Sequence, residues 1–266
     1  MAGSTIQVLT FNCLWRGQAR KRLDAIGRLL DESANDIVCL QEVTRRGSIG
    51  RLQGLLRSYG PAAFHPFRIA VMGGLVTFAR HPIERSSYEV FRDRGLRWNI
   101  SWADKLLRKG FLTSWLNLAT VPVVVINTHL LANYDEDWTP GNRYVRHQLS
   151  ELEQLAEAIE LLDRNALLLV VGDLNVPEST PMLEEFMSRC GLRDAFSSAG
   201  HAPPTIRQSA AGKPPAAIDH ILYRHPSGRE LSVTARVSFV EPVQLLNGRT
   251  VHASDHLAVE AEIGLD

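Results

Sequence analysis

The sequence predicts an α/β fold in which a mixed β-sheet is covered by helices within one domain, residues 1–266. Apolar runs of strand length recur along the chain, and two segments, 18–33 and 142–163, have the apolar repeat of an amphipathic helix. No Ser-, Gly- or Pro-rich linker is long enough to separate two domains. The order of segments also differs from the β–α alternation of a barrel or dinucleotide-binding domain, and no Gly-x-Gly-x-x-Gly follows a strand.

The predicted strands share short apolar or β-branched runs bounded by polar residues. They are 6–11, 36–40, 74–79, 111–118, 122–128, 167–172, 217–223, 232–240 and 257–263. The run LLLVV at 167–171 is typical of a buried strand. In the second helix one apolar face is predicted, comprising Leu149, Leu152, Leu155, Ile159 and Leu162. Residues 199–217 are predicted as an irregular loop.

Composition excludes several classes of protein. Hydrophobic residues make up 45% and charged residues 22%, as in an ordinary globular protein. The longest apolar runs, such as 121–126, are too short to span a bilayer, and no secretory signal is visible. We therefore expect a cytoplasmic protein, free or peripheral to a membrane, with its three scattered cysteines reduced. A net charge of zero counts against tight non-specific nucleic-acid binding but allows a local basic cleft.

Polar side chains recur where the predicted strands stop. Six such places carry carboxylates, amides or imidazoles, at Asn12, Gln41-Glu42, Asn127-Thr128-His129, Asp173-Leu174-Asn175, Asp219 and Ser254-Asp255-His256. A single Asp or Asn after a strand is usually a turn or cap residue. Six together are typical of a site at one edge of a sheet, where α/β proteins bind ligands.

The residue types at these strand ends indicate the chemistry. Two carboxylates, Glu42 and Asp255, and two amides, Asn12 and Asn175, form an oxygen-rich set suited to a hard cation such as Mg²⁺ or Mn²⁺. The scattered cysteines and the absence of a His-x-x-x-His helix argue against zinc. Histidines at these ends can exchange protons near neutral pH, so the set favours attack by water on phosphorus.

The same motifs resemble those of the endonuclease/exonuclease/phosphatase superfamily. They are FN at 11–12, QE at 41–42, NTH at 127–129, GDLN at 172–175, IDHIL at 218–222 and SDH at 254–256. The resemblance covers about residues 5 to 262 and implies a two-sheet α/β sandwich of four layers, with helices flanking mixed sheets. Within the superfamily, FNCLW at 11–15, GGLVTFARHPI at 73–83 and the Lys-Gly-Phe at 109–111 are most similar to magnesium-dependent neutral sphingomyelinases and related phospholipase C-type enzymes.

The resemblance implies a role for each matching residue. Glu42 would be the main metal ligand, with Asn12 adjacent and Asp255 supporting the metal region. Asp173 would hold or deprotonate the attacking water, and His256, oriented by Asp219, would be the base or an imidazolium paired with the phosphate. The resemblance leaves open which of the two takes the proton. Further contacts to the phosphate would come from Asn175, His129 and Lys109.

The segment at 92–111 carries Trp98 and Trp102 four residues apart, with Leu106 four further on and basic residues around them. A helix here would present one aromatic and apolar stripe. Such a stripe can cover a core, or it can seat in a lipid interface with the basic residues on lipid phosphates. The interfacial alternative would place a lipid-facing lid next to Lys109.

Taken together, these observations predict a monomeric Mg²⁺-dependent phosphodiesterase, with Mn²⁺ able to replace Mg²⁺. The favoured substrate is a phospholipid or sphingolipid headgroup ester at a membrane surface. The alternatives are a DNA endonuclease or exonuclease of the same superfamily and a small-molecule phosphatase or phosphodiesterase, which would use the same metal chemistry.

Overall fold

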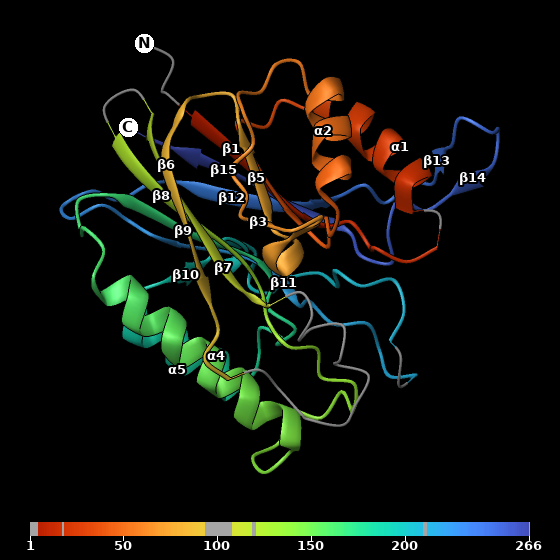
Figure 1. Ribbon diagram of the computed structural model, residues 1–266. Coiled ribbons are helices and arrows are strands. Elements are labelled where there is room, and N and C mark those ends of the chain that lie inside the picture. Colours follow the sequence, from red (N-terminus) through yellow and green to blue (C-terminus); the bar gives the residue numbers. More distant parts are fainter. Residues whose placement is uncertain (1–4, 18, 94–107, 119–120, 210–211, 266) are drawn as a thin grey trace.

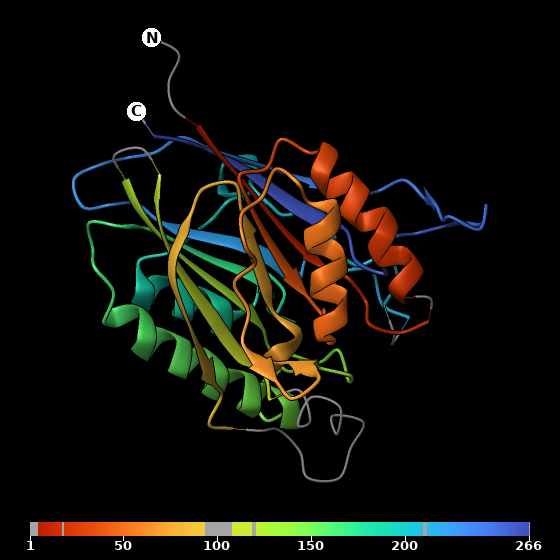
Figure 2. The same ribbon diagram turned by 45° about the horizontal axis from the view of Figure 1, so that its top comes forward.

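Two β-sheets stack face to face, and helices cover the outer face of each (Figures 1 and 2). The computed structural model describes residues 5–17, 19–93, 108–118, 121–209 and 212–265. The first sheet has the order β12 (Val233–Ser238), β15 (Ala258–Gly264), β1 (Thr5–Asn12), β2 (Ile37–Gln41), β5 (Val76–Ala79). The second has the order β10 (Arg193–Asp194), β11 (Asp219–Arg224), β9 (Leu167–Asp173), β8 (Val121–His129), β7 (Gly110–Leu118), β6 (Ile83–Val90).

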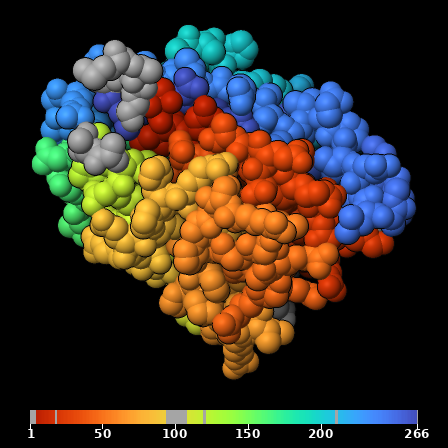
Figure 3. All heavy atoms as spheres, turned by 90° about the horizontal axis from the view of Figure 1, so that it is seen from above, coloured from red at the N-terminus to blue at the C-terminus, as the bar shows by residue number. Residues whose placement is uncertain are grey.

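The remaining described elements are helices and two small hairpins. Helices α1 (Ala19–Glu32) and α2 (Arg46–Leu55) cover the first sheet, and α4 (Arg143–Glu160) and α5 (Pro181–Cys190) cover the second (Figure 2). The hairpins are β3 (Pro66–Phe67) with β4 (Ala70–Val71), and β13 (Val243–Gln244) with β14 (Thr250–Val251). Short 3₁₀ turns occur at η1 (Met72–Gly74) and η2 (Ser197–Ala199). In Figure 3 the N-terminal segments, in red and orange, lie beside the blue C-terminal region.

Strict alternation of side chains explains the four layers. In β8, Val123 and Val125 belong to the core between the sheets, whereas Val124 and Ile126 pack toward α4 and α5. Because successive side chains of a strand point to opposite faces, a strand covered on both faces is apolar along most of its length. The predicted two-sheet α/β sandwich is therefore confirmed.

Buried amides also join the two sheets. The Gln41 Nε2 atom at the end of β2 donates to Asn127 Oδ1 in β8 at 2.8 Å, and both side chains are fully buried. Asn127 Nδ2 donates in turn to the carbonyls of Leu40 and Val76 in the first sheet, at 3.2 and 3.1 Å. A buried amide without partners would cost free energy, so these bonds favour one relative position of the sheets.

The predicted strands all occur, with ends shifted by a few residues, and both predicted helices are present. One detail of the second helix is wrong: Leu149 is 44% exposed, whereas Leu152, Leu155 and Ile159 are buried. The apolar face follows i, i+3 and i+7 from Leu152, and Leu149 lies at its solvent border. Trp98 and Trp102 lie outside the described residues, so their interfacial role stays a prediction.

Candidate active site

The polar strand ends meet at one rim because of the strand directions. Strands β1 and β2 are parallel and end together at the pair Asn12–Gln41, and β8 and β9 end together at His129–Asp173. Strand β11 is antiparallel to β9, so it begins where β9 ends, with Asp219 opposite Asp173. Strand β15 is antiparallel to β1, which brings the segment before it to the same rim.

One chain of hydrogen bonds crosses between the sheets at this rim. Asn12 Nδ2, from the first sheet, donates to Asp173 Oδ2 of the second at 2.9 Å and lies 3.4 Å from Glu42 Oε1. The other oxygen of Glu42 accepts the backbone N–H of Trp15 at 2.8 Å. Asn12 and Asp173 are 1% and 2% exposed, so their carboxylate–amide bond is shielded from water. The predicted metal ligands Glu42 and Asn12 thus lie next to the predicted water-binding carboxylate.

Backbone strain fixes two of the predicted site residues. Glu42 has φ 62° and Asn175 has φ 51°, both in the left-handed region that non-glycine residues rarely adopt. Such conformations cost about 1–3 kcal/mol and persist where the surrounding structure enforces them. The carbonyl of Asn175 accepts Trp138 Nε1 at 3.1 Å and Gln148 Nε2 at 2.9 Å, which hold it in this conformation.

A carboxylate orients the imidazole of His256. The Nδ1 atom of His256 lies 2.8 Å from Asp219 Oδ2, and its Nε2 atom lies 3.8 Å from Asp173 Oδ2. The hydroxyl of Thr205 donates to the same Asp219 oxygen at 2.7 Å and accepts the N–H groups of Ile218 and Asp219. The predicted pairing of Asp219 with His256 is present in the structure.

The pKa values of His256 and Asp173 are both raised, although the balance of burial and charge differs between the two. Burial alone would lower the pKa of His256, but the carboxylates of Asp219 and Asp173 outweigh it and raise that pKa to about 10. Burial, together with the charge of Asp219, raises the pKa of Asp173 to about 7. His256 is therefore a cation at neutral pH, and Asp173 titrates near neutrality.

His129, at the end of β8, and Lys109, just before β7, are two of the predicted contacts to the phosphate. His129 Nε2 lies 3.4 Å from Asp173 Oδ2, and burial and the cations Lys109 and His256 hold its pKa well below the usual range. This imidazole is therefore neutral. Lys109 Nζ donates to the carbonyl of Leu130 at 2.7 Å, which also accepts Asn175 Nδ2 at 3.1 Å.

The remaining predicted ligand, Asp255, lies at the edge of the site. It is exposed, its Oδ1 accepts the hydroxyl of Ser254 at 3.2 Å, and it helps to line a pocket of about 200 Å³ beside His256. Its charge contributes to the raised pKa of His256. The structure thus places Asp255 at the exposed edge of the site, outside the group formed by Asp173, Asp219 and His256.

The donor set fits a divalent cation. Oxygens of Asp173 and Asp219 lie within 4.8 Å of each other and of a nitrogen of His256, which as an imidazolium has no lone pair to offer a metal. Oδ1 of Asp219 is buried and has no hydrogen-bond partner among the described residues. The imidazolium of His256 balances one of these two buried carboxylates, and a bound cation would balance the other. With Glu42 and Asn12 alongside, the rim offers the oxygen ligands that hard cations prefer.

Sequence reasoning missed residues that orient the site from outside the motifs. Thr205 is fully buried against Asp219, although its segment was predicted only as an irregular loop. Gln148, on the buried face of α4, bonds the carbonyls of Leu131 and Asn175 at 2.9 Å each. A glutamine at an otherwise apolar helix position is the one signal that could have identified the latter.

Comparison with known proteins places these observations in a family. A model of the endonuclease/exonuclease/phosphatase family matches residues 9–256. Sphingomyelin phosphodiesterase 2 of Homo sapiens is 28% identical over 261 residues, which cover 91% of this chain and 59% of that protein. The chain thus spans about three fifths of the length of this relative. In the described part, no helix is both long and apolar enough to cross a membrane.

Two solved structures share the fold. The beta toxin of Staphylococcus aureus, a F277A, P278A mutant with bound magnesium ions, gives a TM-score of 0.73 at 16% identity, covering 97% of this chain and 99% of that one. TDP2 of D. rerio, complexed with a single-strand DNA product, gives 0.72 at 14% identity, covering 98% and 99%. At these identities the likeness concerns the fold alone.

Proposed function

The chain belongs to the endonuclease/exonuclease/phosphatase family, and on that premise we propose that it hydrolyses a phosphodiester, namely a phospholipid or sphingolipid headgroup ester. The observation that carries this proposal is the convergence of Asn12, Glu42, Asp173, Asp219 and His256 on one rim. The likeness to a sphingomyelin phosphodiesterase over 91% of the chain supports the lipid substrate.

The protonation state of each residue at the rim determines its proposed role. Asp173, with a pKa near 7, accepts a proton from water as the water oxygen forms its bond to phosphorus; the ester P–O bond breaks, and the leaving oxygen takes a proton from solvent and departs as the alcohol. His256, an imidazolium held by Asp219, pairs with a phosphoryl oxygen and stabilises the charge that develops there. Asn175 and the neutral His129 donate hydrogen bonds to phosphoryl oxygens, and Lys109 supplies positive charge behind them.

Mg²⁺ is the cation that this set would hold, with Mn²⁺ able to replace it. Glu42 and Asn12 would bind it, with Asp255 supporting from the edge. Its chemistry there would be to polarise a phosphoryl oxygen and neutralise developing charge. We expect EDTA to abolish turnover and added Mg²⁺ to restore it. Full activity in excess EDTA would contradict the metal assignment.

Two substitutions test the roles of the reacting groups. Asp173→Asn and His256→Ala should each lower kcat by at least about 10³-fold, because each removes a group that acts on the reacting atoms. Circular dichroism and the unfolding midpoint should show that both variants stay folded. Turnover within tenfold of the parent in either variant would contradict the mechanism.

A nuclease is the alternative, since the fold is shared with TDP2 bound to a DNA product. The two are separated by assaying one preparation with Mg²⁺, Mn²⁺ or Ca²⁺ on sphingomyelin and phosphatidylcholine in mixed micelles and on plasmid and single-stranded DNA. Lipid hydrolysis lost in Asp173→Asn supports the proposal, whereas DNA cleavage with no lipid hydrolysis refutes it.

A further inference from the structure

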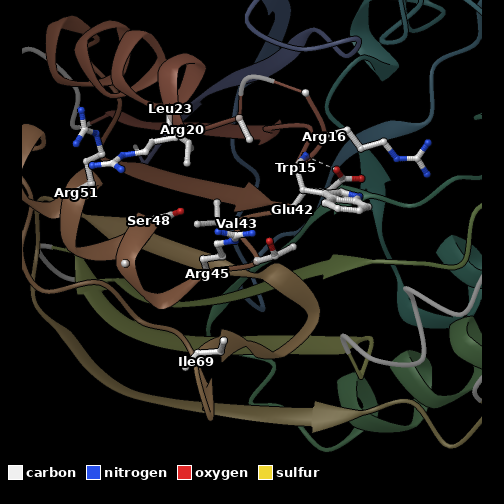
Figure 4. Close-up of a pocket in the computed structure, with 14 residues that line it drawn as sticks. Trp15, Arg16, Arg20, Leu23, Glu42, Val43, Arg45, Ser48, Arg51 and Ile69 are labelled. Atoms are coloured by element: carbon white, nitrogen blue, oxygen red, sulfur yellow. Dashed lines mark hydrogen bonds between the residues drawn. The ribbon is translucent and has the colours of Figure 1, made fainter.

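A pocket of about 1010 Å³ opens beside Glu42, between the loop that follows β1 and the loop that follows β2 (Figure 4). Figure 4 shows Trp15 and Glu42 at one end, Arg20 and Arg51 at the other, and Arg45 with Ser48 between them. Glu42 connects this pocket to the reacting groups, because it neighbours Asn12, which bonds Asp173. A substrate centred on the rim can therefore extend into the pocket.

The pocket is strongly positive in a chain of zero net charge. Its lining contains four arginines, Arg16, Arg20, Arg45 and Arg51, and one carboxylate, Glu42. Arg51 is already paired with Asp24 of α1. Within the described part of the chain, the guanidinium groups of Arg20 and Arg45 make no ion pair. The arginines thus outnumber the single carboxylate of the lining, and two of them face the concave surface outside any ion pair.

Backbone dipoles add to this charge. The pocket lining includes first-turn residues of both α1 and α2, and neither helix has an acidic residue in its first turn. The N-cap of α2, Arg45, makes no side-chain capping bond. The partial positive charge of the two helix ends therefore lies beside the arginines, with no acidic residue of either first turn to offset it.

We propose that this pocket is a subsite for a second phosphate of the substrate, so that the enzyme prefers a lipid whose headgroup carries a phosphomonoester beside the scissile phosphodiester. This inference rests on the proposed function and narrows its substrate class. Guanidinium groups bind phosphate through paired, charge-assisted hydrogen bonds. A choline headgroup would instead bring a positive charge toward Arg45 and Arg20. The pocket's volume is that of a small-molecule site, which favours a headgroup over a duplex lying across the surface.

The test compares two monomeric short-chain substrates, phosphatidylinositol 4-phosphate and phosphatidylinositol, below their critical micelle concentrations. The parent should have the higher kcat/KM for the phosphorylated lipid. In Arg20→Gln/Arg45→Gln the ratio of the two kcat/KM values should fall by about 10- to 100-fold, as expected for losing hydrogen bonds to a charged group. Arg229→Gln, a change at an exposed arginine outside the pocket, is the control and should keep the parent ratio.

A second measurement does not depend on turnover. Inorganic phosphate is titrated calorimetrically into the metal-free protein, and the double variant should bind it at least about tenfold more weakly than the parent and the Arg229→Gln control. Circular dichroism establishes that all three proteins are folded. Loss of phosphate affinity without hydrolysis of any lipid would uphold the subsite and refute the lipid proposal.

Four results would overturn the subsite for a lipid phosphate. One is an unchanged substrate ratio in the double variant, and another is an unchanged phosphate affinity. The third is a preference for phosphatidylinositol 4-phosphate over phosphatidylinositol that appears only on vesicles containing anionic lipid, which would make the arginines a contact for the membrane surface. Cleavage of single-stranded DNA that depends on Arg20 and Arg45, with no lipid cleaved, would assign the pocket to a nucleic-acid phosphate.

Discussion

Gly172→Ala should push apart strands β8 and β9, which end at His129 and Asp173. Gly172 has φ +135° and lies opposite Thr128 in the parallel pair β8–β9, one residue before the pair His129–Asp173. A Cβ atom built on Gly172 would lie 1.9 Å from the carbonyl oxygen of Thr128. Ordinary carbon–oxygen contacts are about 3.3 Å or longer, so the strands would have to part locally by more than about 1 Å.

Two costs follow from this geometry. Overpacking a dense core costs about 1–3 kcal/mol, and a side chain in this region of φ costs about 1–3 kcal/mol more. We expect the free energy of unfolding to fall by about 2–6 kcal/mol. Displacing Asp173 by about 1 Å should also lower kcat by about 10²-fold.

The assays are urea unfolding and initial rates on the same preparation. Gly54→Ala is the matched control, because Gly54 is exposed in α2 with open space around its would-be Cβ. This change should raise the free energy of unfolding by about 0.5–1 kcal/mol and leave turnover unchanged. Parent-like stability and turnover in Gly172→Ala would refute the argument.

Two further predictions concern residues behind the site. Thr205→Val should lower kcat by about tenfold and shift the pH–rate profile, because Asp219 loses a hydrogen-bond donor. Thr205→Ser keeps the hydroxyl and should have the kcat and the pH–rate profile of the parent. Equal effects of the two changes would mean that Thr205 has a packing role only. Burial opposes a charge on His220, but the bond of its Nδ1 atom to Asp194 at 3.0 Å outweighs burial and raises the pKa of His220. The pair therefore stabilises the fold fully below about pH 6.5. This stabilisation is lost as the pH rises through the raised pKa. Asp194→Asn should therefore reduce the free energy of unfolding by about 1–3 kcal/mol at pH 5.5 and by less at pH 9 in urea titrations; a loss independent of pH would contradict this linkage.

The sequence was sufficient for the layers and for most of the rim because both depend on short-range patterns. A buried strand such as 167–172 is visible as an apolar run, and a polar pair directly after it marks the strand's end. Strand direction then brings Asn12, Asp173 and His256 together. The ordered motifs contributed the pairing of Asp219 with His256.

Elements governed by long-range contacts were missed. Helix α2 contains Gly47, Gly50 and Gly54, which weaken any helical signal, and it is held by packing on the first sheet. Strand β6 is mostly exposed, and it is a strand because it pairs with β7 at the sheet edge. The arginine pocket likewise joins loops that are some 25 residues apart, so no local pattern could reveal it.

The pairing of β1 with β15 has a consequence for how the protein is made. Strand β1 precedes its neighbour β15, and the His256 just before β15, by about 250 residues. Until then β1 has an unpaired edge, which can pair wrongly with other chains. A nascent chain also lacks the imidazole that Asp219 is placed to hold. The proposed site can therefore be complete only once β15 has entered the first sheet, and a ribosome-bound chain should be inactive until β15 has emerged.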